Sequence, residues 1–272
     1  MSPRLAGALV LVLLTLIWGS SFAVIRGAVA SFPPSLLVFL RFLVAALLFV
    51  PWLVRRRGWG LAGLELGFWL VLGYGTQAVG LATTTAGRSA FITALSVVLV
   101  PVFAGALGRA VPRRVWLGAA LAFAGVGLLT YDGAPPNRGD LWTLGTAVTY
   151  AILILRLEDY ARRLSVGRLT LAQIFGVLAW SALWVAIDRP APAAVPWPAV
   201  VYLGVVATAL ATWLISLGQS RVSAAEAAVI YALEPVWAAI FAYLLLGEAL
   251  GPRGLLGGGL VLAATLYSQL GK

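Results

Sequence analysis

The sequence contains no cysteine and no histidine among its 272 residues. The lack of cysteine excludes disulfides, thiolate metal sites and cysteine nucleophiles, and the lack of histidine removes the commonest metal ligand and general base. Most hydrolytic and metal-dependent enzymes rely on one of these groups. We therefore expect no catalytic residues, no metal site and no cofactor.

Charged residues are also scarce. They make up 10% of the chain, whereas 62% of the residues are hydrophobic; a soluble domain usually carries about 25% charged residues. This composition predicts an all-α polytopic membrane protein. The charges that are present favour one sign, with 19 Lys and Arg against 9 Asp and Glu. In a soluble protein this excess would suggest nucleic acid, but membrane topology explains it better, so we expect no nucleic-acid partner.

Ten apolar stretches are long enough to form transmembrane helices. Turn residues or charges separate them, as at Phe32-Pro33-Pro34 and at Arg55-Arg56-Arg57-Gly58. The connections are short, and no segment outside the stretches is large enough for a soluble domain. The expected spans run roughly over residues 5–28, 34–54, 61–82, 86–108, 115–131, 140–157, 168–188, 197–217, 223–247 and 254–271.

The basic residues predict the orientation of the spans. An inside N-terminus places thirteen Lys and Arg on the cytoplasmic side and five on the outer side, while Arg41 lies within a span. Cytoplasmic loops carry such an excess, so we expect both termini to be cytoplasmic in a multi-pass protein of the cytoplasmic (inner) membrane. The first stretch stays apolar past Trp18 to Ala30 without a convincing cleavage site, which favours a retained helix over a signal peptide.

The chain also resembles itself. Ala86–Leu107 aligns without gaps on Ala224–Leu245, with an offset of 138 and nine identities in 22 positions. These are the fourth and ninth expected spans, the places that a five-plus-five duplication would give them. A weaker match at an offset of 132 places Trp18 on Tyr150 and Arg41 on Gln173.

An odd number of helices in each copy makes the second copy enter the membrane from the opposite face, as in many secondary transporters. We therefore expect two inverted five-helix repeats, residues 1–132 and 139–272. The alternative is two helical halves that merely pack together, and we favour the inverted repeat over it.

Several segments resemble the EamA-type branch of the drug/metabolite transporter superfamily. They are Trp18-Gly19-Ser20-Ser21-Phe22, Arg41, the stretch from Leu81 to Pro101, and Ala232-Leu233-Glu234-Pro235-Val236 followed by Leu246-Gly247-Glu248. The resemblance covers nearly the whole chain. It implies ten helices, two EamA-like repeats and, most often, export of small metabolites such as amino acids. The first repeat of the family usually also ends in a Gly-Glu pair, whereas here Gly108-Arg109 stands in its place.

Helical spacing gathers polar side chains onto faces that can line a shared cavity. Ser89, Thr93 and Ser96 are spaced i, i+4 and i+7, and the last two map onto Tyr231 and Glu234 in the second copy. A pocket with aromatic walls and a few polar groups is the usual form of a small-molecule site. The full set of candidates is Trp18, Tyr74, Gln77, Ser89, Thr93, Ser96, Tyr150, Thr208, Thr212, Trp213, Tyr231, Glu234 and Trp237.

Each of these residues also has a structural interpretation. Ser and Thr in membrane helices often bond to a backbone carbonyl or hold neighbouring helices together. For a single residue this interpretation is favoured; for the stripes taken together, ligand contact is favoured.

Glu234 and Pro235 interrupt an apolar run, where a carboxylate costs about 2.5–3.5 kcal/mol on insertion scales. Glu234 can bind a substrate amine or exchange a proton, or it can satisfy carbonyls freed near Pro235; the sequence leaves both open. Pro101 does not align with Pro235, so kinks at the two prolines would lie at different depths.

Three further charges have simpler explanations. Ser223 and Glu226 fit a capping box at the start of a helix. Arg88, at the matching position on the outer side, is expected to snorkel to the interface or to attract anionic solutes. Arg41 either snorkels or finds a carboxylate or carbonyl partner.

Taken together, the sequence predicts a secondary transporter that exports small organic metabolites, amino acids or related amphipathic solutes, by alternating access and is not an enzyme. Its partners would be a small-molecule substrate and membrane lipids, and one chain already supplies both repeats, so a monomer is sufficient. A channel or scramblase remains an alternative. A membrane-embedded lipid-modifying enzyme is disfavoured because Glu158-Asp159 is the only acidic doublet.

Overall fold

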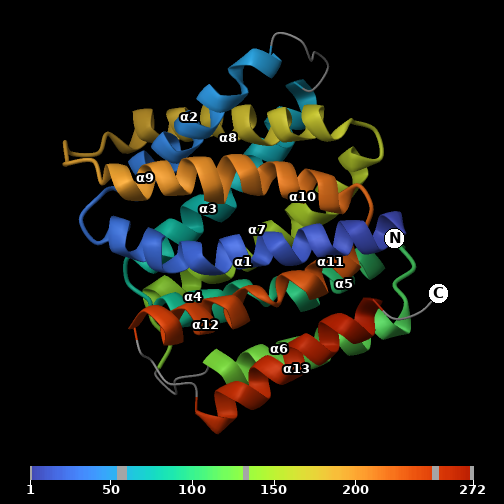
Figure 1. Ribbon diagram of the computed structural model, residues 1–272. Coiled ribbons are helices and arrows are strands. Elements are labelled where there is room, and N and C mark those ends of the chain that lie inside the picture. The colour runs from blue at the N-terminus through green and yellow to red at the C-terminus, as the bar shows by residue number, and fades with distance from the viewer. Residues whose placement is uncertain (1, 54–59, 131–134, 247–250, 270–272) are drawn as a thin grey trace.

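A computed structural model describes residues 2–53, 60–130, 135–246 and 251–269, and every regular element in these ranges is helical (Figure 1). The predicted all-α class is therefore confirmed. The elements are α1 (Pro3–Val29), α2 (Pro34–Leu53), α3 (Gly60–Leu81), α4 (Ala86–Thr93), α5 (Ser96–Ala106), α6 (Arg113–Thr130), α7 (Arg138–Ala161), α8 (Val166–Asp188), α9 (Trp197–Gly204), η1 (Val205–Leu210), α10 (Ala211–Gln219), α11 (Ala224–Tyr231), α12 (Glu234–Leu246) and α13 (Pro252–Gln269).

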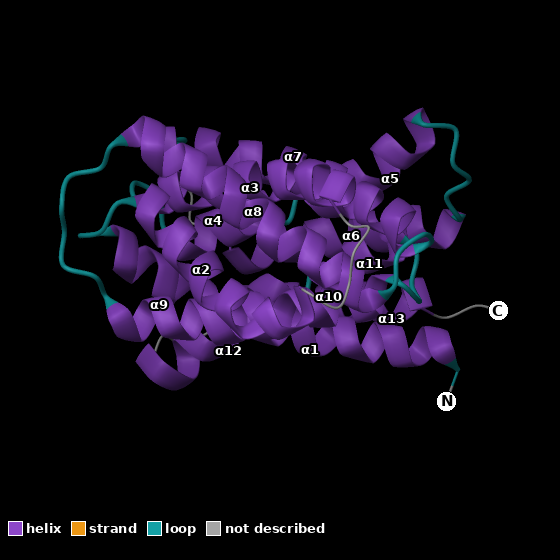
Figure 2. Ribbon diagram, turned by 90° about the horizontal axis from the view of Figure 1, so that it is seen from above, coloured by secondary structure: helices purple, strands orange, loops and turns teal. Residues whose placement is uncertain are grey.

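Seven helical stretches of the described chain are long and apolar enough to cross a membrane. The helices form a bundle with both termini at the same end (Figures 1 and 2). We call this the proximal end, and the opposite one the distal end. The seven stretches are Pro3–Val29, Pro34–Trp52, Ala86–Ala106, Arg138–Ala161, Val166–Asp188, Trp197–Gln219 and Ala224–Phe241.

Helix packing follows a pattern that recurs in the two halves of the chain. Helix α3 packs against α7 and α8, and in the same way the stretch from α9 to α10 packs against α1 and α2. The last helix, α13, lies along α6 at one edge of the bundle (Figure 1). The central volume is thus bounded mainly by α1–α5 and α7–α12.

Glycines let several helices approach to backbone contact. A Cβ atom on Gly176 of α8 would lie 2.0 Å from the Gly63 carbonyl oxygen of α3, and one on Gly67 would lie 2.3 Å from the Gly176 carbonyl carbon. Gly63 and Gly67 form a G-x-x-x-G motif, the spacing that allows close packing of membrane helices. No larger side chain fits at this α3–α8 contact without moving the backbone.

The expected fourth and ninth spans are both interrupted, the fourth between α4 and α5 and the ninth between α11 and α12. At each break a backbone N–H donates to a carbonyl three residues earlier: Leu95 to Ile92 at 3.1 Å, and Leu233 to Ile230 at 3.0 Å. The chain therefore makes a tight 3₁₀ turn at equivalent positions of the two spans.

The prolines expected to kink these spans lie differently with respect to the breaks. Pro235 is the second residue of α12, directly after its break, where the missing N–H costs no helical hydrogen bond. Pro101 is buried inside α5, beyond the break that precedes this helix. The two breaks match in position, so they do not lie at the different depths that the prolines suggest.

A π-helix, η1, interrupts the helical stretch between α9 and α10. Single-turn π-helices within α-helices are often found at functional sites. Just before it, a Cβ atom on Gly204 would lie 2.6 Å from the Val44 Cβ atom and 3.0 Å from the Arg41 carbonyl oxygen. Gly204 therefore allows this segment to pack directly on α2, next to Arg41.

The capping predicted at the start of α11 is partly right. Ser223 is the N-cap and its hydroxyl accepts from the Glu226 N–H at 3.3 Å. The Glu226 carboxylate, however, accepts from the Ser223 hydroxyl at 3.0 Å and from Arg4 and Arg114. The capping-box interpretation expects the Glu226 carboxylate to accept from the Ser223 amide N–H. In the structure it accepts from Arg4 and Arg114 instead.

Some sequence expectations lie outside the described residues. They concern the basic loop Arg55-Arg56-Arg57, the Gly247-Glu248 pair, the end of the first repeat at residue 132, and Lys272.

Candidate solute-binding cavity

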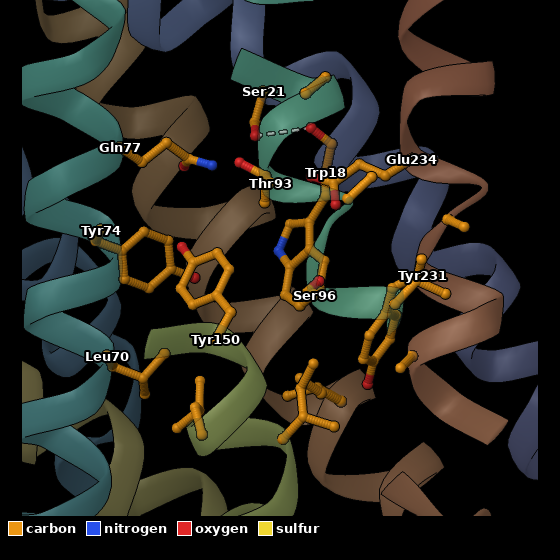
Figure 3. Close-up of a pocket in the computed structure, with 18 of the residues that line it drawn as sticks. Trp18, Ser21, Leu70, Tyr74, Gln77, Thr93, Ser96, Tyr150, Tyr231 and Glu234 are labelled. Carbon is orange, nitrogen blue, oxygen red and sulfur yellow. Dashed lines mark hydrogen bonds between the residues drawn. The ribbon is translucent and has the colours of Figure 1, made fainter. Parts of the chain in front are cut away.

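A cavity lies at mid-height of the bundle, among the breaks in the helices and the middle of α1, α3, α7 and α10. Figure 3 shows side chains from several of these helices converging on it. Nine of the thirteen predicted cavity residues line it: Trp18, Tyr74, Gln77, Thr93, Ser96, Tyr150, Thr212, Tyr231 and Glu234.

Aromatic rings form much of the cavity wall. The Trp18 and Tyr231 rings have centroids 5.6 Å apart, and the Tyr74 and Tyr150 rings meet edge to face at 6.0 Å. Gly19, next to Trp18, allows α1 to approach α12 closely, because a Cβ atom at Gly19 would lie 2.8 Å from the Glu234 carbonyl oxygen. Helix α1 therefore passes directly over the start of α12.

Three buried polar atoms of the wall have no hydrogen-bond partner among the described residues. They are the Trp18 Nε1, the Thr93 Oγ1 and the Tyr231 hydroxyl. A buried polar group without a partner costs about 1–3 kcal/mol, so native structures rarely keep one without a functional reason. The cavity thus presents an indole donor and two hydroxyls to whatever it encloses.

Arg41 supplies a positive charge to the cavity wall. Its side chain is 2% exposed; Nε donates to Thr208 Oγ1 at 2.8 Å and an Nη donates to the Ala207 carbonyl at 3.1 Å. Both acceptors belong to η1, and the guanidinium also lies 4.6 Å from the Tyr74 ring centroid. The carbonyl partner predicted as one possibility for Arg41 is confirmed. A guanidinium stays charged in proteins, so this cation is permanent.

Glu234 supplies a carboxylate to the same cavity. It is the first residue of α12, where the positive end of the helix dipole favours a negative group. Among the described residues no hydrogen bond or ion pair involves its carboxylate. The cavity wall therefore holds one cation and one acidic group that is not committed to another side chain.

Residues matched by the two sequence offsets line this cavity together. Four pairs share it, one member from each half of the chain: Trp18 with Tyr150, Arg41 with Gln173, Thr93 with Tyr231, and Ser96 with Glu234.

Four predicted residues lie outside the cavity wall. Ser89 lies one turn before Thr93 in α4, and its hydroxyl meets the Thr143 hydroxyl of α7 at 3.4 Å instead of the cavity. Thr208 lies in η1, and its hydroxyl accepts from Arg41 of α2. The Trp237 indole N–H donates to the Thr15 hydroxyl at 3.0 Å. Trp213 is 42% exposed on the outside of the bundle.

Three polar residues line the cavity that were not among the candidates: Ser21, Arg41 and Gln173. The Ser21 hydroxyl donates to the Trp18 carbonyl at 2.8 Å (Figure 3), and Gln173 Nε2 donates to Ser216 at 2.8 Å. The offset that aligned Trp18 with Tyr150 also aligned Arg41 with Gln173. The alignment of Arg41 with Gln173 could therefore have identified these two residues as cavity residues; nothing comparable points to Ser21.

Comparison with known proteins gives consistent results. The model of the EamA-like transporter family matches residues 5–131 and again residues 137–268. An uncharacterized transporter from Archaeoglobus fulgidus is 34% identical over 277 residues, covering 98% of this chain and 87% of that protein. The uncharacterized transporter YvbV from Bacillus subtilis is 28% identical over 208 residues, covering 70% of this chain and 68% of YvbV.

A crystal structure of another protein shows the same fold. It superposes with a TM-score of 0.80, covering 98% of this chain and 97% of that one, at 20% sequence identity.

Proposed function

Because the chain belongs to the EamA-like transporter family, we propose that it is a secondary transporter moving small organic solutes by alternating access. It is an integral multi-pass membrane protein, and its family and relatives point to a transporter without enzymatic activity. The observation that carries the proposal is the central cavity, with its unpartnered polar atoms and its two opposite ionisable groups.

The proposed architecture is ten transmembrane helices in two inverted repeats, residues 1–132 and 139–272. The double match of the family model supports it, as do the equivalent breaks in the fourth and ninth spans. Two glycine contacts support it further. A Cβ atom on Gly139 would lie 2.5 Å from the Gly80 carbonyl oxygen, and one on Gly7 would lie 3.1 Å from the Gly218 carbonyl oxygen. The offsets of 132 and 138 relate these two contacts.

The proposed solutes are amino acids or related molecules that carry both an acidic and a basic group. Arg41 would bind the anionic group, Glu234 the ammonium group, and the aromatic walls the apolar part. The excess of basic residues at the proximal loops favours a cytoplasmic proximal end. The proposed direction, export from the cytoplasm, rests on resemblance to the family.

A thermal-shift screen of amino acids, nucleosides and amphipathic drugs on purified protein tests this site. Thr93→Val and Tyr231→Phe remove only the two unpartnered hydroxyls, so a bound solute should lose about 2- to 10-fold in affinity for each hydrogen bond. Thr170→Val and Tyr267→Phe make the same changes outside the cavity and should leave the shift unchanged. If both cavity variants bind every hit with unchanged affinity, the solutes bind elsewhere.

A further inference from the structure

Helices α4 and α11 each have eight residues and end at the equivalent breaks described above. Helix α4 starts at the distal end and α11 at the proximal end, and both run inward to the cavity (Figures 1 and 2). Each ends on a cavity residue, Thr93 in α4 and Tyr231 in α11. These two half-helices therefore lie between the cavity and the two ends of the bundle.

The start of α4 is fixed by an ion pair. Arg88 is the third residue after the N-cap Thr85, and its guanidinium contacts the carboxylate of Asp140 at the start of α7. Arg88 Nε also donates to Asp140 Oδ1 at 3.3 Å, and the Thr84 hydroxyl donates to the same oxygen at 2.7 Å. The Arg88 and Asp140 side chains are 13% and 8% exposed. Arg88 thus binds a neighbouring helix rather than only snorkelling to the interface, as the sequence suggested.

The start of α11 is fixed in the same way with the charges exchanged. Glu226 is the third residue after the N-cap Ser223, and its carboxylate accepts from Arg4 at the start of α1 at 2.7 Å. Arg114, at the start of α6, donates to the same oxygen at 3.3 Å. Glu226 is the residue that the offset of 138 places on Arg88.

Both ion pairs tie a half-helix to the first helix of the opposite half of the chain. Asp140 belongs to the first helix after residue 137, and Arg4 to the first helix of the chain. Each half-helix also packs against the broken span of the other half, α4 against α12 and α11 against α5 (Figure 1). If α4 moves, its contacts with α12 change, and if α11 moves, its contacts with α5 change.

We propose that α4 and α11 are the two gates of the cavity, hinged at their breaks and held closed by the Arg88–Asp140 and Arg4–Glu226 ion pairs. Loss of the first pair opens the distal path, and loss of the second opens the proximal path. The short 3₁₀ turns at the breaks supply the bending points. This inference rests on the proposed transport function, because a cavity with two alternately opened paths is what transport requires.

The absence of native cysteine allows a direct test that needs no known solute. Ser96→Cys puts one thiol in the cavity wall, and its labelling by a membrane-impermeant maleimide is measured in vesicles of each orientation. Single cysteines at Ser2 and Ser31, which are exposed at the proximal and distal ends, identify the face that the reagent reaches. Arg88→Gln should raise labelling through the distal face roughly tenfold, and Glu226→Gln through the proximal face, the change expected for loss of a charge-assisted hydrogen bond.

Matched variants separate gating from general loosening of the fold. Asp140→Asn should reproduce Arg88→Gln, Arg4→Gln should weaken the proximal gate, and each double variant should add little to its stronger single change, because partners in one interaction are not additive. Arg88→Lys keeps the charge and should label more slowly than Arg88→Gln. Arg162→Gln breaks an exposed ion pair with Glu158 and should change neither rate.

Three results would overturn the account in distinguishable ways. If Ser96→Cys is labelled from neither face in the otherwise unchanged chain, the transport proposal itself fails. If it is labelled from both faces but Arg88→Gln and Glu226→Gln change nothing, the ion pairs do not hold the gates. Equal increases on both faces in either variant would indicate loosening of the whole bundle and contradict the gates as well.

Discussion

Replacing Gly176 by alanine is expected to destabilise the protein more than the same change at any glycine that faces open space. The new Cβ atom would lie 2.0 Å from the Gly63 carbonyl oxygen and 3.0 Å from the Gly67 Cα atom, so α3 and α8 would have to separate. Overpacking of this kind typically costs about 1–3 kcal/mol. Because α8 also packs on α2, the displacement would spread beyond the single contact.

The measurement is the thermal unfolding midpoint of the purified protein in detergent. Gly27→Ala in α1 is the matched control, since apart from the backbone of its own helix and its chain neighbours nothing lies within 4 Å of the position that its Cβ would occupy. Alanine there should leave the midpoint unchanged or raise it, because alanine is the better helix former. Equal midpoints for the Gly176 and Gly27 variants would show that backbone contact between α3 and α8 is not needed.

Replacing Glu234 by glutamine is expected to have the largest effect on transport. Glutamine keeps the shape of the side chain but can neither lose a proton nor balance an ammonium group. If the carboxylate binds a substrate amine, the affinity should fall roughly 10- to 100-fold, which corresponds to the loss of one hydrogen bond to a charged group. If it exchanges a proton, uptake driven by a pH gradient should disappear, while exchange at equal pH on both sides should persist.

Transport in proteoliposomes, with and without a pH gradient, distinguishes these two roles. Glu65→Gln is the matched control, because Glu65 lies outside the cavity wall and its partner Arg156 keeps Asp159 at 3.0 Å. A Glu234→Gln protein with normal affinity, normal rate and unchanged pH dependence would leave Glu234 a structural role only.

The sequence predicted the helices well because long apolar runs and turn residues are local features. The expected span 34–54 corresponds to α2 (Pro34–Leu53), and the expected span 197–217 begins with α9 at Trp197. It did not predict η1 or the break before α5, since η1 itself and the Ala94-Leu95 break contain no proline or glycine. At η1 the Arg41 side chain of α2 donates to the Ala207 carbonyl, a tertiary contact that local sequence does not reveal.

The cavity residues were most predictable at positions that one of the two sequence offsets pairs, such as Trp18 with Tyr150 and Ser96 with Glu234. They were less predictable elsewhere. Helical spacing identifies a shared face but not the neighbour that this face meets, so it predicts Ser89 and Thr208 in the cavity although they contact Thr143 and Arg41. For Arg41 the sequence predicts only that it snorkels or binds a carboxylate or a carbonyl group. Only the structure places it in the same cavity as Glu234.

Counterflow in proteoliposomes tests most directly whether this protein is a carrier with one central site. Vesicles containing the purified protein are loaded with an unlabelled solute from the thermal-shift screen, and uptake of the labelled solute is followed. A carrier should show uptake stimulated by the internal solute, with a transient overshoot, and the Tyr231→Phe change should reduce its apparent affinity. Uptake that is indifferent to internal solute would contradict alternating access and indicate a channel.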